Sequence, residues 1–382
     1  MAKAERTFVG LYSGGAGDGI DAALVRIDGS GEHMTVRQTH CVHRPSPELP
    51  HARVQSAGAG WAMPAADLAR LDRDMGDLLA DACEALLKEA STPGKYVAGI
   101  GLIGHAVGYT RPSPSSGRGA ICELGSPATL CRRTGLAVAA GFAETDLAAG
   151  GVGGPMWAWP DWLMFRDDRL SRVVVHLGGI ATITFIGSAA AACDVVAYDT
   201  GPGTILIDYL AHQLFKRDTD TDGAIAARGS VNGALLNELL SAEYFHRTPP
   251  KRTTSDDWSG PAAQRLEMLA GKHRCEAATL LTTVTELTAR TVATAVLGMT
   301  ERPHEVVLTG GGAMNIHLAG RIRTLLSPCS TYACERYGLA MRAHGATAAA
   351  VMAAARIDAL PAHCHSATGA AEPAVLGSLW AP

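Results

Sequence analysis

Two segments of the chain share one pattern, in which an apolar strand, a glycine-rich turn and a second apolar strand follow one another. The first spans residues 7–29 with its turn at 13–19, and the second spans residues 172–186 with its turn at 178–179. Such turns between apolar runs are typical of β-hairpins. Because 382 residues are too many for one ordinary core, this recurrence favours two similar lobes.

The rest of the chain alternates between apolar spacings typical of strands and of helices. Strands are expected at 96–103, 136–142, 195–198 and 305–309, and helices at 66–89, 205–214, 276–298 and 339–356. This alternation predicts an α/β fold. Residues 30–65 carry only loop-rich signals, and residues 151–165 are rich in Gly, Pro and Trp. We therefore expect an N-terminal lobe of residues 1–165 and a C-terminal lobe of residues 166–382, whose last helix packs back on the first lobe.

The composition argues against several classes of protein. A formal net charge of −4 without a long run of Lys or Arg argues against a nucleic-acid partner. No apolar run reaches the roughly 18–20 residues that cross a membrane, and the start of the chain carries no secretory signal. Nine cysteines without a CxxC pair argue against a disulfide framework, so we expect a cytoplasmic protein.

Two clusters of histidine and cysteine have spacings that suggest metal binding. They are His40-Cys41 with His43, and His363-Cys364-His365. Each cluster lacks a second group of ligands at zinc-site spacing. We therefore interpret these side chains as loop or packing residues.

Three glycine-rich turns, at 14–19, 201–203 and 310–312, each follow an expected strand. Glycine lets backbone N–H groups approach an anion closely, and a helix N-terminus favours negative charge. Asp18 and Asp199 lie beside two of the turns, where a carboxylate is useful if it holds Mg²⁺. One such turn is usually only a turn, but three with two carboxylates favour a nucleotide site.

Asp146 is a further candidate, because it follows an expected strand and precedes a run of small residues. That position predicts a loop at a strand end, where α/β folds bind ligands. A carboxylate held there is able to act as a general base. The alternative is an ordinary turn or helix-capping aspartate.

Along nearly its whole length the chain resembles the anhydro-N-acetylmuramic acid kinases of the hexokinase/actin-like ATPase superfamily. The matching motifs, in chain order, are Gly10-Leu11-Tyr12-Ser13-Gly14, Asp18-Gly19-Ile20-Asp21, Asp146-Leu147-Ala148-Ala149-Gly150-Gly151, Leu177-Gly178-Gly179-Ile180-Ala181, Tyr198-Asp199-Thr200-Gly201-Pro202-Gly203, Asp208, Asp222-Gly223, Pro249-Pro250-Lys251, Gly310-Gly311-Gly312-Ala313 with Asn315, and Thr368-Gly369-Ala370. The resemblance implies a two-lobed actin-like/ribonuclease H-like ATPase fold with a central cleft.

The resemblance also implies a reaction and the residues that perform it. Family enzymes use ATP and Mg²⁺ to add water across the 1,6-anhydro bridge of a sugar and to phosphorylate O6. It implies that Asp146 activates the water, that Asp18 holds the metal, that His105 and Lys251 contact the sugar, and that the enzyme is a homodimer. The residues implied to bind the nucleotide are Ser13, Gly14, Gly15, Gly17, Asp18, Gly19, Gly178, Gly179, Asp199, Gly201, Gly203, Gly310, Gly311, Gly312 and Asn315.

The chain departs from the family pattern mainly where the family contacts sugar and metal. The family's Gly-Thr-Ser is Gly14-Gly15-Ala16, its His-Gly-Gln-Thr is Gly104-His105-Ala106-Val107, its Gly-Asp-Pro-Ala is Gly125-Ser126-Pro127-Ala128, the arginines before its base are Ala143, Glu144 and Thr145, its Pro-Pro-Lys-Ser-Thr-Gly-Arg-Glu is Pro249-Pro250-Lys251-Arg252-Thr253-Thr254-Ser255-Asp256, and its metal-binding Glu falls on Gly345. Lost hydrogen-bond partners change which substrate a site accepts. We therefore expect an ATP-dependent kinase with an altered sugar, glycoside or nucleoside acceptor.

Two other functions stay open at this point. The changes at Gly15, Ala16 and Gly345 fit a non-catalytic relative that binds a nucleotide or sugar. The same site is also able to host hydrolysis or elimination on an activated sugar.

Overall fold

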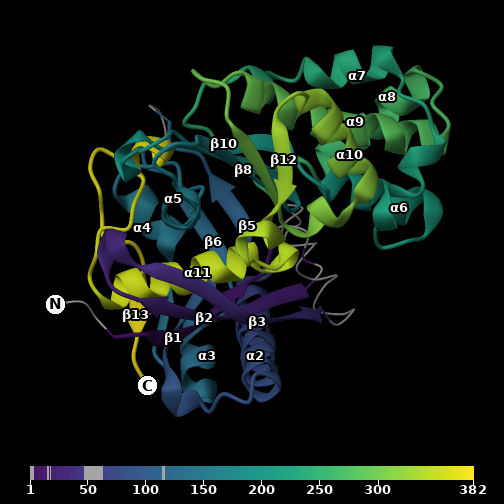
Figure 1. Ribbon diagram of the computed structural model, residues 1–382. Helices are drawn as coiled ribbons and strands as arrows, with labels where there is room; N and C mark the ends of the chain where they lie inside the picture. The colour runs from purple at the N-terminus through teal and green to yellow at the C-terminus, as the bar shows by residue number, and fades with distance from the viewer. Residues whose placement is uncertain (1–3, 15–16, 18, 47–62, 114–116) are drawn as a thin grey trace.

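The computed structural model describes the chain except for residues 1–3, 15–16, 18, 47–62 and 114–116 (Figure 1). Its strands form two large sheets and one small one. The first sheet has the order β13 (Ser378–Trp380), β7 (Val138–Ala140), β4 (Val97–Ile103), β1 (Arg6–Tyr12), β2 (Gly19–Asp28) and β3 (Thr35–Pro45). The second has the order β10 (Val196–Pro202), β9 (Ile180–Ile186), β8 (Arg172–Leu177), β11 (Glu305–Thr309) and β12 (Ser330–Ala333), and the small sheet pairs β5 (His105–Thr110) with β6 (Ala120–Leu124).

The two large sheets repeat one topology. In the first, β1, β2 and β3 form an antiparallel meander, and β4 and β7 continue the sheet in parallel on the other side of β1. In the second, β8, β9 and β10 form the meander, and β11 and β12 continue it in parallel beside β8. Both expected hairpins are present, and the α/β class is confirmed. Strand β3 lies where we expected loop; as an exposed, polar edge strand it lacks the alternation of a half-buried strand.

Helices cover both faces of these sheets. Their bounds are α2 (Ala65–Glu89), α3 (Pro127–Thr134), α4 (Phe142–Ala148), α5 (Ala158–Phe165), α6 (Ile205–Phe215), α7 (Gly233–Leu240), α8 (Pro261–Lys272), α9 (Ala277–Leu297), α10 (Ile316–Leu326), α11 (His344–Ile357) and α12 (His365–Thr368). Helices α2 and α3 cover one face of the first sheet, while α11 covers the other. In the part of the chain that is described, no helix is both long and apolar enough to cross a membrane.

Helix α11 approaches the first sheet unusually closely. A β-carbon at Gly10 of β1 would overlap the carbonyl oxygen of Ala346, and one at Gly101 of β4 would overlap that of Ala349. Only glycine at these two strand positions permits this contact. Helix α11 thereby ties a late segment of the chain to the first sheet, and it lies in one core cluster with α5 and with side chains of both large sheets.

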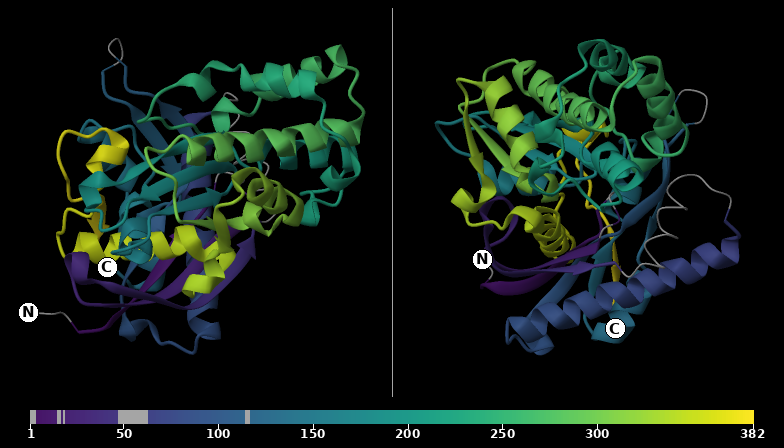
Figure 2. Two further views of the ribbon diagram at one scale, coloured as in Figure 1. Left: turned by 45° about the horizontal axis from the view of Figure 1, so that its top comes forward. Right: turned by 90° about the vertical axis from the view of Figure 1, so that its right-hand side faces the viewer.

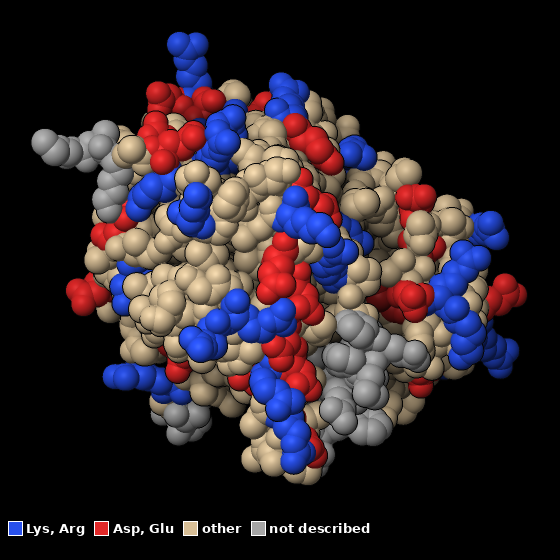
Figure 3. Space-filling view, turned by 90° about the horizontal axis from the view of Figure 1, so that it is seen from below, with Lys and Arg blue, Asp and Glu red and all other residues tan. Residues whose placement is uncertain are grey.

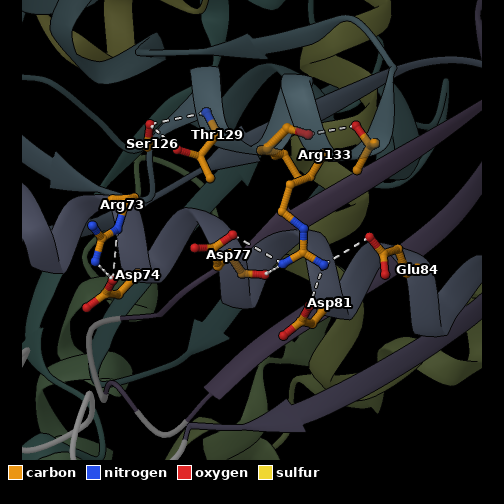
Figure 4. Close-up of polar contacts among 10 residues, drawn as sticks. Arg73, Asp74, Asp77, Asp81, Glu84, Ser126, Thr129 and Arg133 are labelled. Carbon is orange, nitrogen blue, oxygen red and sulfur yellow. Dashed lines mark hydrogen bonds and ion pairs between the residues drawn. The ribbon is translucent and has the colours of Figure 1, made fainter.

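Charged side chains fasten α3 to the outer helix α2. Arg133 of α3 donates to Asp77, Asp81 and Glu84, which lie along one side of α2 (Figure 4). Figure 3, seen from below, shows acidic and basic side chains gathered in a stripe across this face of the molecule. Figure 2 shows α2 running beneath the first sheet, on the side away from the second sheet.

Candidate functional site

Three glycine segments meet at the end of strand β8. A β-carbon at Gly203 would overlap the carbonyl oxygen of Gly178. One at Gly310 would lie 2.6 Å from the carbonyl oxygen of Leu177, and one at Gly312 would lie 2.9 Å from that same atom. The turns at 178–179, 201–203 and 310–312 therefore form one packed junction, called the glycine junction below, that only glycine permits.

Several backbone amides at the glycine junction bind the protein itself. The N–H of Gly203 donates to Gly179 O at 2.8 Å, that of Gly310 to Met341 O at 2.8 Å, and that of Gly178 to Ile180 O at 3.2 Å. These three amides already donate to carbonyl oxygens of the protein, and the expectation that the three residues bind a nucleotide stays a prediction. Strand β10 also continues through Asp199 and Gly201 to Pro202, beyond the expected strand end.

Asp199 and Asn315 both accept hydrogen bonds from other groups of the protein. Asp199 is buried, and it accepts hydrogen bonds from the Thr182 hydroxyl at 2.8 Å and the Thr253 N–H at 3.0 Å. Burial raises the pKa of Asp199, while the Thr253 hydrogen bond opposes the shift. Asn315 caps α10 by accepting from the Leu318 N–H at 2.9 Å. Helix α10 begins after the short 3₁₀ helix Gly311–Met314 rather than at the turn itself.

The first glycine turn is linked to the second sheet through Tyr12. Gly15, Ala16 and Asp18 lie outside the described residues, so the metal role of Asp18 stays a prediction. Around them, Ser13 N–H donates to Ile103 O, Gly17 N–H donates to Gly14 O, and Gly19 begins β2. The ring of Tyr12 lies 6.2 Å from the rings of both Trp157 and His176.

His176, at the end of β8, is a buried residue that sequence reasoning missed. It is 3% exposed, and neither ring nitrogen has a hydrogen-bond partner. Burial lowers the pKa of His176 well below its usual range, and neighbouring His344 adds to the shift. Because its Nε2 would lie 3.0 Å from a β-carbon at Gly178, the imidazole borders the glycine junction.

Asp146 lies in helix α4, not on the expected loop. The strand before it is short, ending at Ala140, and Gly141 with φ 72° starts the helix directly. Asp146 has no exposed surface. Asp146 therefore does not face open space in this structure, although a general base must reach the proton that it removes.

His363 and Gly153 hold the Asp146 carboxylate. Oδ2 accepts from the Gly153 N–H at 2.6 Å, and Oδ1 lies 2.7 Å from His363 Nε2. Because His363 Nδ1 accepts from the Ala374 N–H at 3.2 Å, the ring proton is on Nε2 and is donated to Asp146. The only sequence signal for His363 was its place in the His363–His365 cluster.

A cationic cavity lies next to this carboxylate. Its volume is about 390 Å³, and its lining is Arg111, Val152, His246, Arg247, Thr248, Pro250, Lys251 and Arg252. Arg252 Nη1 is buried without a hydrogen-bond partner and would lie 2.6 Å from a β-carbon at Gly153. Gly153 thus contacts both the guanidinium and the Asp146 carboxylate. The sequence did not predict that Arg111 or Arg252 binds a ligand.

The two residues expected to contact the sugar lie in different surroundings. Lys251 lines the cationic cavity, with Nζ 4.9 Å from the centre of the Tyr244 ring. Burial lowers the pKa of Lys251, while Asp199 opposes the shift. His105 is buried on β5, paired with Leu124.

Glu123 is a second acidic group near Arg252. Burial raises the pKa of Glu123 to about 7, Arg252 opposes the shift, and Glu144 adds to it. The protonated form is therefore favoured in the folded protein. Its contribution to stability is present below the ordinary value of 4.5 and is lost as the pH rises through about 7.

Replacing Glu123→Gln should remove this pH dependence. Glutamine mimics the protonated acid, so the variant should gain stability relative to the natural protein as the pH rises from about 5 to about 8. Urea midpoints at the two pH values measure the difference. An equal difference between the two proteins at both values would contradict the assigned cause.

The chain is similar in sequence to proteins of one known family. A sequence model of the family described as anhydro-N-acetylmuramic acid kinase matches residues 6–382. Proteins named anhydro-N-acetylmuramic acid kinase are similar to the chain: that of Salinibacter ruber is 34% identical, covering 100% of this chain and 97% of its own, and that of Gloeobacter violaceus is 32% identical, covering 97% of each.

Solved structures that align with the chain have lower sequence identity to it than these relatives. The activator of 2-hydroxyisocaproyl-CoA dehydratase from Clostridium difficile has a TM-score of 0.45 at 9% identity, covering 92% of this chain and 96% of its own. A ROK hexokinase from Thermus thermophilus has a TM-score of 0.35 at 16% identity, covering 90% and 97%.

Proposed function

We propose, on the premise that this chain belongs to the anhydro-N-acetylmuramic acid kinase family, that it transfers a phosphate group from ATP to a hydroxyl of a sugar that carries an acid group. Family membership makes it a kinase of the actin-like α/β class. The nature of the acceptor is our own inference. We infer that this acceptor differs from the sugar of the family in those chemical groups that the replaced residues would have contacted.

The observation that carries this proposal is the cationic cavity beside Asp146. Arg111, Arg247, Lys251 and Arg252 all line it, and Arg252 Nη1 has no hydrogen-bond partner within the protein. Guanidinium groups bind carboxylates with charge-assisted, directional hydrogen bonds. Relatives are named for a muramic acid, which by name carries such a group. The arginines that the family has before its base are absent here, and Arg111 and Arg252 supply the charge instead.

On this proposal the chain's own residues position two substrates. The nucleotide phosphates rest against the glycine junction, where the guanidinium of Arg342 would lie 3.6 Å from a β-carbon at Gly311. The acid group of the acceptor binds Arg252. Asp146 removes a proton once the segment of residues 150–154 moves, because that segment covers its carboxylate. Phosphoryl transfer depends mainly on such positioning and charge neutralisation.

The implied magnesium ion does not fit the described residues. A side chain at position 345, where the family has its metal-binding Glu, would lie 2.6 Å from the Tyr12 ring. The unsatisfied groups beside that ring are nitrogens of His176, His344 and Trp157, whereas Mg²⁺ prefers oxygen. No step of the proposal is therefore assigned to Mg²⁺.

Replacing Arg252→Gln tests the acceptor class. Loss of one charge-assisted hydrogen bond should raise the KM for an acidic sugar by about 10–100-fold and leave the KM for ATP unchanged. Steady-state ADP release, with the anhydro sugar and a panel of sugar acids as acceptors, provides both constants. Arg302→Gln, at an exposed site, is the control. An unchanged acceptor KM in the Arg252 variant would reject the anionic acceptor.

One observation favours the non-catalytic alternative. Asp146 is fully buried and its two oxygens are both engaged, as expected of a structural carboxylate. Calorimetry measures ATP binding, and a coupled assay measures ADP release. A protein that binds ATP and releases no ADP with any acceptor is the non-catalytic relative.

A further inference from the structure

Buried nitrogen atoms beside the glycine junction lack hydrogen-bond partners. They are both ring nitrogens of His176, Nδ1 of His344 and Nε1 of Trp157. His176 is 3% exposed and His344 is fully buried. Buried polar atoms are almost always satisfied, so their concentration in one place indicates a bound group that the protein alone does not supply.

His344 has the environment of a metal ligand. Its Nε2 lies 2.6 Å from Asp161 Oδ1, and the other carboxylate oxygen accepts from the Thr184 hydroxyl at 2.7 Å. The carboxylate accepts, so Nε2 carries the proton and Nδ1 presents a lone pair. Histidines that bind metals commonly donate their other ring N–H to a carboxylate in this way.

His176 lies close enough to His344 for both imidazoles to bind one cation. The two ring centroids are 5.1 Å apart, and that of Trp157 is 4.7 Å from His176. With metal–nitrogen bonds of about 2.0–2.1 Å, two imidazoles on one cation have centroids roughly 5–6 Å apart. The separation of the two rings therefore matches a shared cation.

We propose that Nδ1 of His344 and one ring nitrogen of His176 bind a divalent transition-metal cation, such as Mn²⁺ or Co²⁺, at the nucleotide phosphates. This deepens the proposed function and rests on it for the place of the nucleotide. Imidazole nitrogens suit transition metals and oxygen ligands suit Mn²⁺, so a mixed set of imidazole and phosphate favours such a cation over Mg²⁺.

Two protein ligands suffice for such a cation. Phosphate oxygens and water complete the coordination of nucleotide-bound metals. This agrees with the finding that, among the residues described, no three His, Cys, Asp or Glu side chains are grouped to hold a metal by themselves. Trp157 Nε1 is then available to donate to a phosphate oxygen.

Pulsed electron paramagnetic resonance of the natural protein with Mn²⁺ and ADP tests the ligands without any substitution. Coordination by imidazole should produce ¹⁴N modulation in the Mn²⁺ signal. A Mn²⁺–ADP complex bound to the protein without nitrogen coupling would overturn the proposal, as would failure of Mn²⁺ to bind.

Variants test the same site by affinity. His176→Asn and Asp161→Asn should each weaken Mn²⁺ binding in the presence of ADP by about 10–100-fold, the effect typical of ligand and supporting residues. His212→Asn, on the exposed side of α6, is the matched control. Circular dichroism establishes that each variant is folded. Unchanged Mn²⁺ affinity in a folded His176→Asn protein would overturn the proposal.

These measurements do not require turnover. A protein that binds Mn²⁺ through nitrogen but releases no ADP would reject the kinase proposal and retain the metal site. A protein that transfers phosphate with Mg²⁺ and shows no nitrogen coupling with Mn²⁺ would reject the metal site alone.

Discussion

Gly10→Val should prevent the chain from folding stably. A β-carbon at Gly10 would overlap the Ala346 carbonyl oxygen, which belongs to the backbone of a helix and has no rotamer to change. Overpacking of a core usually costs about 1–3 kcal/mol, and a forced shift of a whole helix costs at least the upper end of that range. Typical proteins have only about 5–15 kcal/mol of stability, so the variant should lose a large part of it. Urea denaturation followed by circular dichroism measures the loss.

Gly101→Val should behave in the same way, since it meets Ala349 on the next turn of α11. Gly271→Ala is the matched control, because a β-carbon there meets nothing within 4 Å on helix α8. The control should gain about 0.5–1 kcal/mol from the better helix propensity of alanine. If Gly10→Val unfolded at the same urea concentration as the natural protein, the packing of α11 on the first sheet would be wrong.

Asp146→Asn should abolish phosphoryl transfer. Loss of a general base lowers kcat by about 10²–10⁴-fold. The new NH2 group of asparagine would also face a donor, because His363 Nε2 and the Gly153 N–H both donate to this carboxylate. His363 is unable to adopt the other tautomer, because its Nδ1 already accepts from the Ala374 N–H. A thermal melt should therefore show a loss of about 1–3 kcal/mol, the cost of one unsatisfied buried group.

Nucleotide affinity separates the chemical effect from the structural one. The folded Asp146→Asn protein should bind ATP as tightly as the natural protein and turn it over far more slowly. Asp168→Asn, at an exposed site, should change neither quantity. A variant of Asp146 that retained full kcat would show that the carboxylate only supports the fold.

The repeated topology could be predicted from sequence because its signal is local. Each hairpin is carried by consecutive apolar residues around a glycine turn, and both β1–β2 and β8–β9 appear where expected. Strand β3 could not be predicted, since its exposed edge position lacks a clear apolar alternation. Helix α4 was missed because seven residues are too short to show helical periodicity.

The contacts that define the site are long-range and have no sequence signature. His363 meets Asp146 from 217 positions away, and His344 meets Asp161 from 183 positions away. The resemblance identified Asp146 and the glycines as important, but it did not indicate that several glycine amides donate to carbonyl oxygens of the protein itself. Arg252 is a departure from the family pattern, so only its position beside Gly153 suggests a role.

ATP turnover with a pair of acceptors that differ only in charge tests most directly whether the protein is a kinase for acidic sugars. An acidic sugar and the same sugar with its carboxylate converted to a neutral amide would be compared for ADP release and phosphorylated product. We expect phosphorylation of the acid and a strong preference for it over the amide. Equal turnover of both acceptors, or ATP binding without phosphorylation of any acid in the panel, would contradict this expectation.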